Sequence, residues 1–534
     1  MKKRFWIGII TITVLLSGCF SNNEEPLGEV KSTDYATMEA QQGNRMDFTF
    51  DESNMSIISI SAANGTIERS SNTKYYYTPS YIGNSDKITV DYIDSVGDRK
   101  IKIYNVNLKN KVTFLLYLSS ENSLGSYNYN TDDLAEISKV TMEKNNRNVN
   151  VVVYIDTVSE KTTSTTGNGC YYYTGVSTDT IIVNGETLTG FKKSEYYGTG
   201  NTGTASELTG FINYVKENFQ SEKYVLDLWS HGDGWLPSSY STTKSTKQIC
   251  LDEGDKSSLD MWEVESAISG SEIPKMDVIY TDACLMGGIE VAYQLKDVSD
   301  YLVFSPELTP GPGGDYEGII NSINSNYSSS ETMAEKIVEA NDTFYKNYVE
   351  KYTESGKSVV YNYSYVFTAV DQSKLSLLTD TLKSAYEELM LSENSSLVSK
   401  VKANKSNILC YSYKIINQSE EYNTNTIYVD LGSFWNNVET LAKSTTHTAN
   451  LQAKIDVFQS AYSDYIIANK YGDGKYYING KLNYTEYETG STGISIYTDL
   501  INLSGEDEYS EYKTATYYGA LSWWRIILEE FYKA

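Results

Sequence analysis

Length, composition and charge limit the class of protein before any motif is considered. The 534-residue chain is too long for one ordinary domain and indicates two or three. Hydrophobic residues make up 40% of the chain and only 7 residues are proline, which excludes a disordered or collagen-like protein. A formal net charge of −26 argues against a nucleic-acid partner and favours cationic protein segments.

The N-terminus has the pattern of a bacterial lipoprotein signal peptide. Basic residues 2–4 precede an apolar stretch, 5–16, that is too short to span a bilayer comfortably, and small residues then lead to Cys19. We expect residues 1–18 to be removed and Cys19 to carry a lipid. That lipid would anchor the chain to a bacterial membrane, outside the cytoplasm, at the cell surface or facing the periplasm. The alternative is an ordinary secretory signal followed by a chance cysteine.

Two segments without catalytic motifs come next. Residues 19–43 are polar and acidic, which predicts a flexible tether. Residues 44–110 contain short alternating runs separated by turn signals such as Asn64-Gly65. Strands at this spacing predict a small all-β sandwich, and the segment resembles the bacterial Ig-like modules that act mainly as spacers.

From residue 111 the pattern changes to strands that alternate with helices. This alternation predicts an α/β domain with a mainly parallel sheet flanked by helices. A turn-rich insertion is expected at 164–203, and a glycine-rich loop suited to lining a cleft at 309–314. We expect strands at 112–118, 149–155, 224–229, 276–281, 359–370 and 493–497, and helices at 132–142, 206–219, 259–269, 331–354, 374–391 and 449–468.

Two short motifs follow two of the predicted strands directly. Ser230-His231-Gly232 comes after the first strand and Asp282-Ala283-Cys284 after the second. Functional groups collect beyond the carboxyl ends of parallel strands, so adjacent strands would bring His231 and Cys284 together. A histidine can activate a cysteine thiol and then protonate the leaving amine. The pair therefore predicts a cysteine peptidase.

The residues around the pair suit the same chemistry. Glycine at 232 permits a close backbone approach, so the Gly232 and Cys284 amides could form an oxyanion hole. Residues 286–293 have the pattern of a helix that begins just after Cys284. The positive end of such a helix would favour the thiolate.

The extended motifs resemble those of the clostripain family of cysteine peptidases. The resemblance rests on Leu228-Trp229-Ser230-His231-Gly232-Asp233-Gly234-Trp235 and on Thr281-Asp282-Ala283-Cys284-Leu285-Met286-Gly287-Gly288. It extends to residues 117–124, 305–311, 428–431 and 493–497, and so covers roughly 111–534. It implies a peptidase domain over these residues that ends in a C-terminal α/β extension.

The resemblance also implies a caspase-like sheet, a dyad of His231 and Cys284, and protein or peptide substrates cleaved after Arg or Lys. Asp282 matches a family position associated with the basic-residue pocket, and a carboxylate there has a direct reason to hold a cationic side chain. The alternative for Asp282 is a cap on the following helix. Asp315 is a weaker pocket candidate. The chain departs from the usual family pattern at Asp233 and Pro306.

Residues 238–247 are small and polar and predict an exposed loop beside the cleft. Relatives of the clostripain type are often activated by cleavage in this region after a basic residue. The resemblance therefore implies self-cleavage after Lys244 or Lys247, with an uncut loop as the alternative.

The remaining cysteines and acidic turns give weaker signals. Cys170, Cys250 and Cys410 could form disulfides with one another or with Cys284, but they show no compact framework and no CxxC metal pair. His447 is interpreted as a solvated loop residue. The chemistry requires no cofactor. Calcium is a candidate ligand for residues 252–255, because some relatives depend on it, although a solvated acidic turn is the favoured interpretation.

The sequence as a whole predicts a lipid-anchored cysteine endopeptidase. One alternative is a surface-binding lipoprotein, an adhesin or peptide receptor, in which the same fold carries an idle dyad. Another is a peptidase specific for acidic residues or asparagine, against which Asp282 argues.

Overall fold

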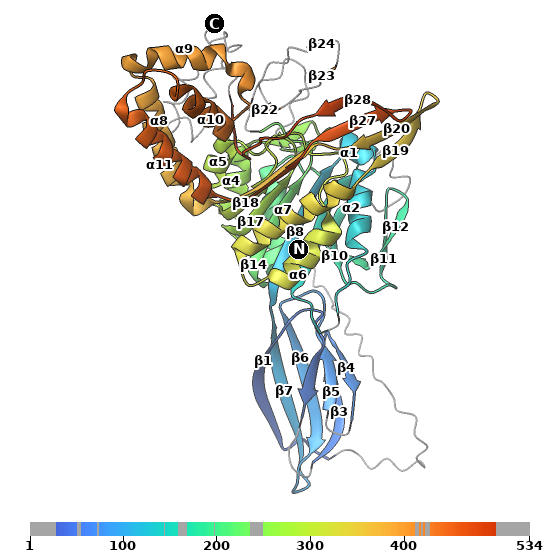
Figure 1. The fold of residues 1–534 in the computed structure, drawn as a ribbon. Coiled ribbons are helices and arrows are strands. Elements are labelled where there is room, and N and C mark those ends of the chain that lie inside the picture. Colours follow the sequence, from blue (N-terminus) through green and yellow to red (C-terminus); the bar gives the residue numbers. More distant parts are fainter. Residues whose placement is uncertain are drawn as a thin grey trace.

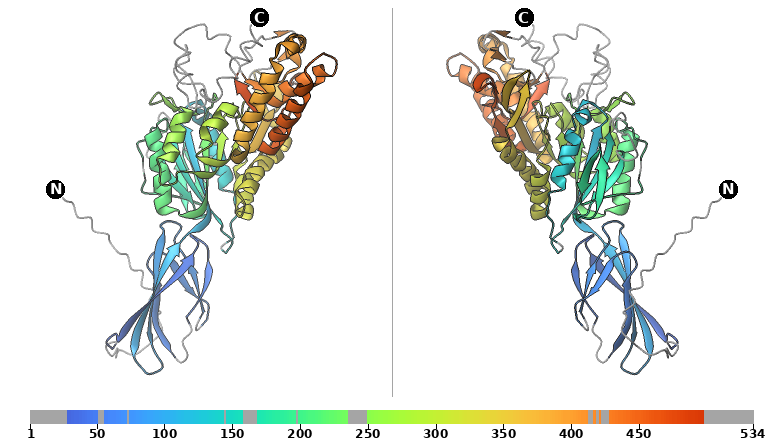
Figure 2. Two further views of the ribbon diagram at one scale, coloured as in Figure 1. Left: turned by 90° about the vertical axis from the view of Figure 1, so that its left-hand side faces the viewer. Right: turned by 90° about the vertical axis from the view of Figure 1, so that its right-hand side faces the viewer.

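The computed structural model describes residues 28–497, with gaps at 51–54, 72–73, 144, 158–167, 197, 235–248, 412–415, 418–419 and 422–427. The predicted signal peptide, the lipidation site Cys19 and the cleavage candidates Lys244 and Lys247 all lie outside the described residues. A narrow β-unit at the N-terminal end joins a broad α/β body, and the last described helices lie against one side of that body (Figures 1 and 2).

The N-terminal unit is formed by two sheets around one apolar core. Its core side chains come from both sheets, and Phe48 meets Tyr104 edge-to-face between them. An all-β sandwich is therefore present, and its relation to Ig-like modules stays a prediction. One sheet has the order β1 (Ser32–Ala40), β7 (Arg99–Leu108), β6 (Ser85–Ile93) and β3 (Ser56–Ala62), and the other the order β2 (Met46–Thr49), β5 (Lys74–Thr78) and β4 (Thr66–Arg69).

The predicted tether is wrong over part of its length. Residues 32–40 form β1, which pairs in parallel with β7 from Ser32↔Lys100 to Ala40↔Leu108. From Ala36 to Ala40 exposed polar side chains alternate with partly or fully buried ones, and this period of two allows one face to pack while the other stays in water. The sandwich therefore begins at Ser32 rather than at residue 44.

The centre of the α/β body is a nine-stranded sheet. Its five central strands, β9, β8, β14, β17 and β18, are parallel, and antiparallel strands extend it at both edges. The mainly parallel α/β sheet predicted from the sequence is therefore confirmed at its centre. The order is β13 (Phe191–Lys193), β10 (Gly169–Tyr173), β9 (Val149–Thr157), β8 (Asn110–Ser120), β14 (Ser221–Trp229), β17 (Met276–Asp282), β18 (Ser299–Phe304), β21 (Tyr365–Asp371) and β26 (Ile466–Gly472).

Helices cover both faces of this sheet (Figure 1). On one face the core includes side chains of α3 (Ala205–Asn218), α4 (Met261–Ser269), α5 (Ile289–Leu295) and α8 (Leu375–Leu389). On the other it includes side chains of α2 (Tyr129–Ile137), α6 (Tyr316–Asn326) and α7 (Ser330–Asn347). Strand β8 supplies alternate residues to the two cores, Leu115 and Tyr117 to one and Phe114 and Leu116 to the other.

The remaining elements are shorter or lie at the periphery. The helices among them are α1 (Ser123–Ser126), α9 (Ser395–Ala403), α10 (Leu431–Ala442) and α11 (Ala449–Tyr465), and 3-10 turns occur at Gln372–Lys374, Ser392–Asn394 and Lys405–Asn407. The strands are β11 (Thr180–Val183), β12 (Glu186–Thr189), β15 (Ile249–Asp252), β16 (Ser257–Leu259), β19 (Glu350–Glu354), β20 (Lys357–Asn362), β22 (Cys410–Tyr411), β23 (Ile416–Asn417), β24 (Glu420–Glu421), β25 (Tyr428–Asp430), β27 (Gly474–Ile478), β28 (Lys481–Glu486) and β29 (Ser495–Tyr497). Among the described helices, none is long and apolar enough to cross a membrane.

Three predicted helices are too long. The helix predicted over 132–142 ends at Ile137, and the other two run into strands. The helix predicted over 331–354 ends at Asn347, and Glu350–Glu354 forms β19. The helix predicted over 449–468 ends at Tyr465, and the edge strand β26 begins at Ile466. In both, sheet pairing at the C-terminal end overrides a helical pattern. The predicted strand 359–370 is two strands, β20 and β21.

The two units meet through a short polar junction. Strand β7 ends at Leu108 and β8 begins at Asn110, so only one residue separates them. Gln42 Nε2 donates to the carbonyl oxygens of Gly83 and Asn218, both at 2.8 Å. Its Oε1 accepts a hydrogen bond from Asn150 Nδ2. These contacts fix the sandwich to the sheet at the amino-terminal ends of its parallel strands, whereas His231 and Cys284 lie beyond the carboxyl ends.

Candidate active site

The two motifs meet because β14 and β17 are adjacent parallel strands in matched register. Trp229 pairs with Asp282 in the last register position, so His231 and Cys284 each lie two residues beyond it. The backbones stay together past the strands, where Ser230 N donates to Asp282 O at 3.3 Å. The predicted juxtaposition of the two motifs is present in the structure.

Gly232 is where the two motifs touch. A Cβ at this position would lie 2.4 Å from the Cys284 carbonyl oxygen and 3.1 Å from the Cys284 amide nitrogen. The first distance is too short for any side chain, so glycine is required here for a steric reason. The same contact places the Gly232 backbone beside the Cys284 amide, and Gly232 also forms an antiparallel bridge with Ile249. The oxyanion hole stays a prediction.

A third segment holds the histidine. Nε2 of the half-buried His231 lies 2.7 Å from Ser123 Oγ, at the first residue of α1. The preceding residue, Asn122, is buried and its Nδ2 donates to Leu251 O at 2.9 Å and to Ser230 Oγ at 3.3 Å. Sequence reasoning gave Ser123 and Asn122 no role, although both fall in the 117–124 segment that carries part of the family resemblance.

The cysteine lies in an environment that favours the neutral thiol. Cys284 is a partly buried residue, and its Sγ has the Thr309 carbonyl oxygen 3.9 Å away. Burial, followed by the charges of Glu307, Asp282 and Asp233, raises the pKa of the Cys284 thiol to about 11. Thiolate at neutral pH therefore requires removal of the proton by a base.

The predicted helix that would favour the thiolate is wrong in its position. Helix α5 begins at Ile289 after Gly288, and it has only 7 residues. Between Cys284 and this helix the chain turns sharply, with Leu285 at φ +63°. Leu285 N donates to Glu307 O at 3.0 Å, which ties the turn to the neighbouring loop. A left-handed conformation at a non-glycine residue is a strained feature of the kind that gathers at functional sites.

Asp282 is a buried carboxylate that faces the loop before α6. It is 4% exposed, and its Oδ2 accepts hydrogen bonds from Gly314 N at 2.7 Å and from the Tyr316 hydroxyl at 3.1 Å. Burial raises the pKa of Asp282 to about 6. It does not cap α5, because the N-cap of that helix is Gly288. The alternative interpretation of Asp282 as a cap on the following helix is therefore wrong.

Two further aspartates that the sequence did not single out lie beside Asp282. The Tyr316 hydroxyl is 2.9 Å from Asp227 Oδ2, and a Cβ on Gly313 would lie within 3.4 Å of carboxylate oxygens of both Asp282 and Asp133. Asp133 is 1% exposed. The Trp229 side chain lies close enough to Asp133, and the Tyr280 hydroxyl close enough to Asp282, to lower the pKa of each carboxyl, but neither contact is a well-aligned hydrogen bond. Burial and the Asp282 charge raise the pKa values of Asp133 and Asp227.

Asp315 has a structural partner. It is the N-cap of α6, and its carboxylate accepts a hydrogen bond from Gly318 N at 3.0 Å. Its role in the pocket stays a prediction. His447 lies before α11, with Nδ1 2.8 Å from the Thr445 carbonyl oxygen.

The disulfide alternatives are wrong for the described chain. Its four cysteines, Cys170, Cys250, Cys284 and Cys410, are free thiols. Cys170 and Cys250 are buried in β10 and β15, and burial raises the pKa of each above its ordinary value. They therefore act as small apolar core residues.

The acidic turn at 252–255 is not simply solvated. Asp252 is fully buried, and its carboxylate lies with those of Glu121 and Asp156 so that one oxygen from each falls within 4.8 Å of the others. The Asp156 and Asp252 carboxyl groups face each other closely enough to interact, and Oδ2 of each receives no well-aligned hydrogen bond from the described residues. Burial, followed by Asp252 and Glu121, raises the pKa of Asp156 to about 9. Three carboxylates that converge in this way fit a hard cation such as calcium.

A cysteine and a histidine at the carboxyl edge of a mainly parallel sheet are the arrangement of a cysteine peptidase. Residues 116–530 match the sequence profile of the clostripain family, and the chain belongs to this family. A clostripain from Hathewaya histolytica is 28% identical over 235 residues, which are 41% of this chain. The chain spans 43% of the length of that relative.

Solved structures agree with the fold. A secreted C11 cysteine protease from Bacteroides thetaiotaomicron, in complex with an irreversible peptide inhibitor, superimposes with a TM-score of 0.53 at 19% identity, over 78% of this chain and 99% of its own. An inactive zymogen C11 protease from Parabacteroides distasonis gives a TM-score of 0.50 at 19% identity, over 77% and 98%. The α/β body of this chain therefore has the fold of the C11 proteases.

Proposed function

We propose that the chain is a cysteine endopeptidase that cleaves after Arg or Lys, with Cys284 as nucleophile and His231 as its base, on a caspase-like sheet. The contact of Gly232 with the Cys284 backbone supports this proposal most directly, because it sets the chain that follows His231 against the backbone of Cys284. The proposed enzyme is tethered outside the cytoplasm by a lipid on Cys19, with the β-sandwich as an Ig-like spacer.

The proposed reaction proceeds through a thioester. His231 takes the Cys284 proton as Sγ attacks the scissile carbonyl, and the amides of Gly232 and Cys284 stabilise the oxyanion. The carbon–nitrogen bond then breaks, and the imidazolium returns the proton to the leaving amine. Water, deprotonated by His231, attacks the thioester and releases the acid and the thiol. Ser123 holds the imidazole in place at 2.7 Å.

Replacement of the nucleophile tests the proposal. Cys284→Ala is expected to lower kcat/KM on Arg and Lys peptides roughly a thousandfold or more, because no thioester can form. The melting temperature should change little, since only one sulfur atom is removed. His231→Ala should be almost as severe. Undiminished hydrolysis by Cys284→Ala would exclude the dyad, and inactivity of the wild type on all peptides would favour the surface-binding alternative.

Asp282 supports the proposed preference for basic residues. Its buried carboxylate lies two residues before Cys284, next to Asp133, and several oxygens of this cluster receive no well-aligned hydrogen bond from the described residues. Unpaired buried carboxylates are costly, and an entering guanidinium or ammonium group would supply the missing hydrogen bonds and charge. The same negative cluster would repel an acidic side chain, which argues against an acid-specific peptidase.

Selectivity should depend on the charge of Asp282. Asp282→Asn is expected to lower kcat/KM for Arg and Lys peptides by about 2 kcal/mol, roughly thirtyfold, and to spare a norleucine peptide. Because the pKa of Asp282 is raised to about 6, the carboxylate is ionised above that pH and protonated below it. The ratio of Arg to norleucine hydrolysis should therefore fall as pH drops through 6 in the wild type. An equal loss on both peptides would instead indicate a structural carboxylate.

We also propose self-processing after Lys244 or Lys247, which follow His231 closely in sequence. One structural relative is described as an inactive zymogen, which supports activation by cleavage in this family. Mass spectrometry of freshly folded wild type and Cys284→Ala should reveal a cut after one of the two lysines in the wild type alone. An intact wild type with full activity would contradict the proposal, and so would the same cut in both proteins.

Calcium is proposed as a structural ligand of Glu121, Asp156 and Asp252. Glu121 precedes Asn122 and Ser123, so an ion bound there would stiffen the segment that contacts His231. Calcium is expected to raise the melting temperature by roughly 3 °C at saturation, through binding to the folded state. Asp252→Asn should abolish this shift, and Glu253→Gln, an exposed neighbour, should retain it. No shift in the wild type would contradict the proposal.

A further inference from the structure

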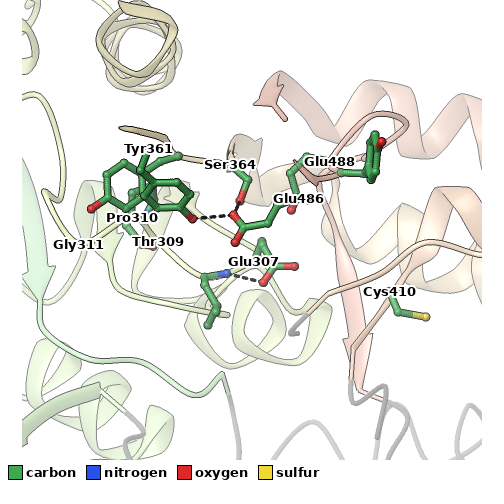
Figure 3. Close-up of a pocket in the computed structure, with 12 residues that line it drawn as sticks. Glu307, Thr309, Pro310, Gly311, Tyr361, Ser364, Cys410, Glu486 and Glu488 are labelled. Carbon is green, nitrogen blue, oxygen red and sulfur yellow. Dashed lines mark hydrogen bonds between the residues drawn. The ribbon is translucent and has the colours of Figure 1, made fainter. Parts of the chain in front are cut away.

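A cavity of about 230 Å³ lies next to the nucleophile. The loop 307–311 forms one wall, and residues near the ends of β20 and β28 form the other (Figure 3). The loop wall adjoins the site directly, because Thr309 O is 3.9 Å from Cys284 Sγ and Glu307 O accepts from Leu285 N at 3.0 Å. A group in this cavity would therefore lie close to a peptide held at Cys284.

Three glutamates line the cavity, and their side chains differ in how they are held. The carboxylate of Glu486 accepts hydrogen bonds from the Tyr361 and Ser364 hydroxyls, each at 2.8 Å (Figure 3). Glu307 Oε1 accepts from Leu308 N at 2.8 Å. Glu488 is only 5% exposed, and the charges nearest to it are those of other carboxylates. Burial, then the charges of Glu307 and Glu486, raises the pKa of Glu488 to about 9, so the free carboxyl group is protonated at neutral pH. A cation that binds beside it lowers this pKa and displaces the proton.

The other walls suit a long cation. Tyr361, Tyr363 and Tyr487 contribute aromatic rings to the lining, and none of the described residues that line the cavity is basic. Lysine and arginine carry an apolar stem that packs on aromatic rings and a charged head that pairs with carboxylates. A buried carboxyl group surrounded by other carboxylates gains the most from such a partner.

We propose that this cavity is a second specificity site, which takes the side chain of an additional Arg or Lys in the substrate, near the residue after which the chain is cut. Glu488 is the principal acceptor, and Glu307 and Glu486 contribute charge. The proposal rests on the peptidase function proposed above. Its substrates are then polypeptides with two basic residues close together.

The test uses internally quenched peptides with one Arg and otherwise neutral small residues. A Lys is placed in turn at each of the three positions before and the three positions after the Arg. For the wild type, one position is expected to raise kcat/KM about tenfold over the peptide with Arg alone, as for a partly buried charge pair. Glu488→Gln should reduce this ratio to within about twofold of unity.

Two further variants make the result specific. Glu354→Gln makes the same chemical change at an exposed position of β19, in the sheet that also contains β20 and β28, and should retain the tenfold ratio. Tyr487→Ala changes a second residue of the cavity and should also lower the ratio. Because Tyr487 is 55% exposed, this variant should fold normally, so the test does not depend on the folding of Glu488→Gln alone. The proposal is overturned if no position of Lys helps the wild type, or if the preference survives both cavity variants. A wild type that does not cut the peptide with Arg alone would overturn the peptidase function as well.

Discussion

The site depends on the register between two adjacent parallel strands. β14 and β17 pair from Val225↔Val278 to Trp229↔Asp282, so their next residues leave the sheet at the same level. A slip by one residue would turn every side chain of one strand to the opposite face and separate the motifs. Both strands are buried on both faces, which fixes the register strongly. The close contact of Gly232 with Cys284 follows from this pairing, and so does the reach of Ser123, from the end of β8, to His231.

The second constraint is electrostatic. The chain buries Asp133, Asp227 and Asp282 close together, although no Lys or Arg of the described chain forms an ion pair with them. Such groups raise one another's pKa and destabilise the free protein. Their cost is offset if a cation enters when substrate binds, so that part of the binding energy comes from relief of this repulsion. The same reasoning applies to Glu488 in the neighbouring cavity. An acidic protein with two sites of this kind is suited to basic polypeptides.

The sequence was informative where chemistry and local pattern coincide. His231 and Cys284 each follow an apolar run with a strand pattern, so both their identity and their position at a sheet edge could be predicted. Asp227 also lies inside one of these apolar runs. A charged residue in a strand that is otherwise apolar is a sequence signal of a buried functional carboxylate. Asp133 and Glu488 had no such signal, because their neighbours come from distant segments such as Gly313 and Glu307. The strands at 32–40 and 350–354 were missed because pairing with a remote strand decided their conformation.

The central claim is that Cys284 becomes a nucleophile through His231, beside an acidic pocket. Labelling with peptidyl acyloxymethyl ketones, followed by mass spectrometry of the digested protein, tests it most directly. The account predicts that an Arg or Lys reagent modifies Cys284 alone among the cysteines, much faster than an Asp reagent does, and that His231→Ala suppresses the reaction. Labelling of Cys410 at a comparable rate, or labelling of Cys284 that is equally fast without His231, would contradict it.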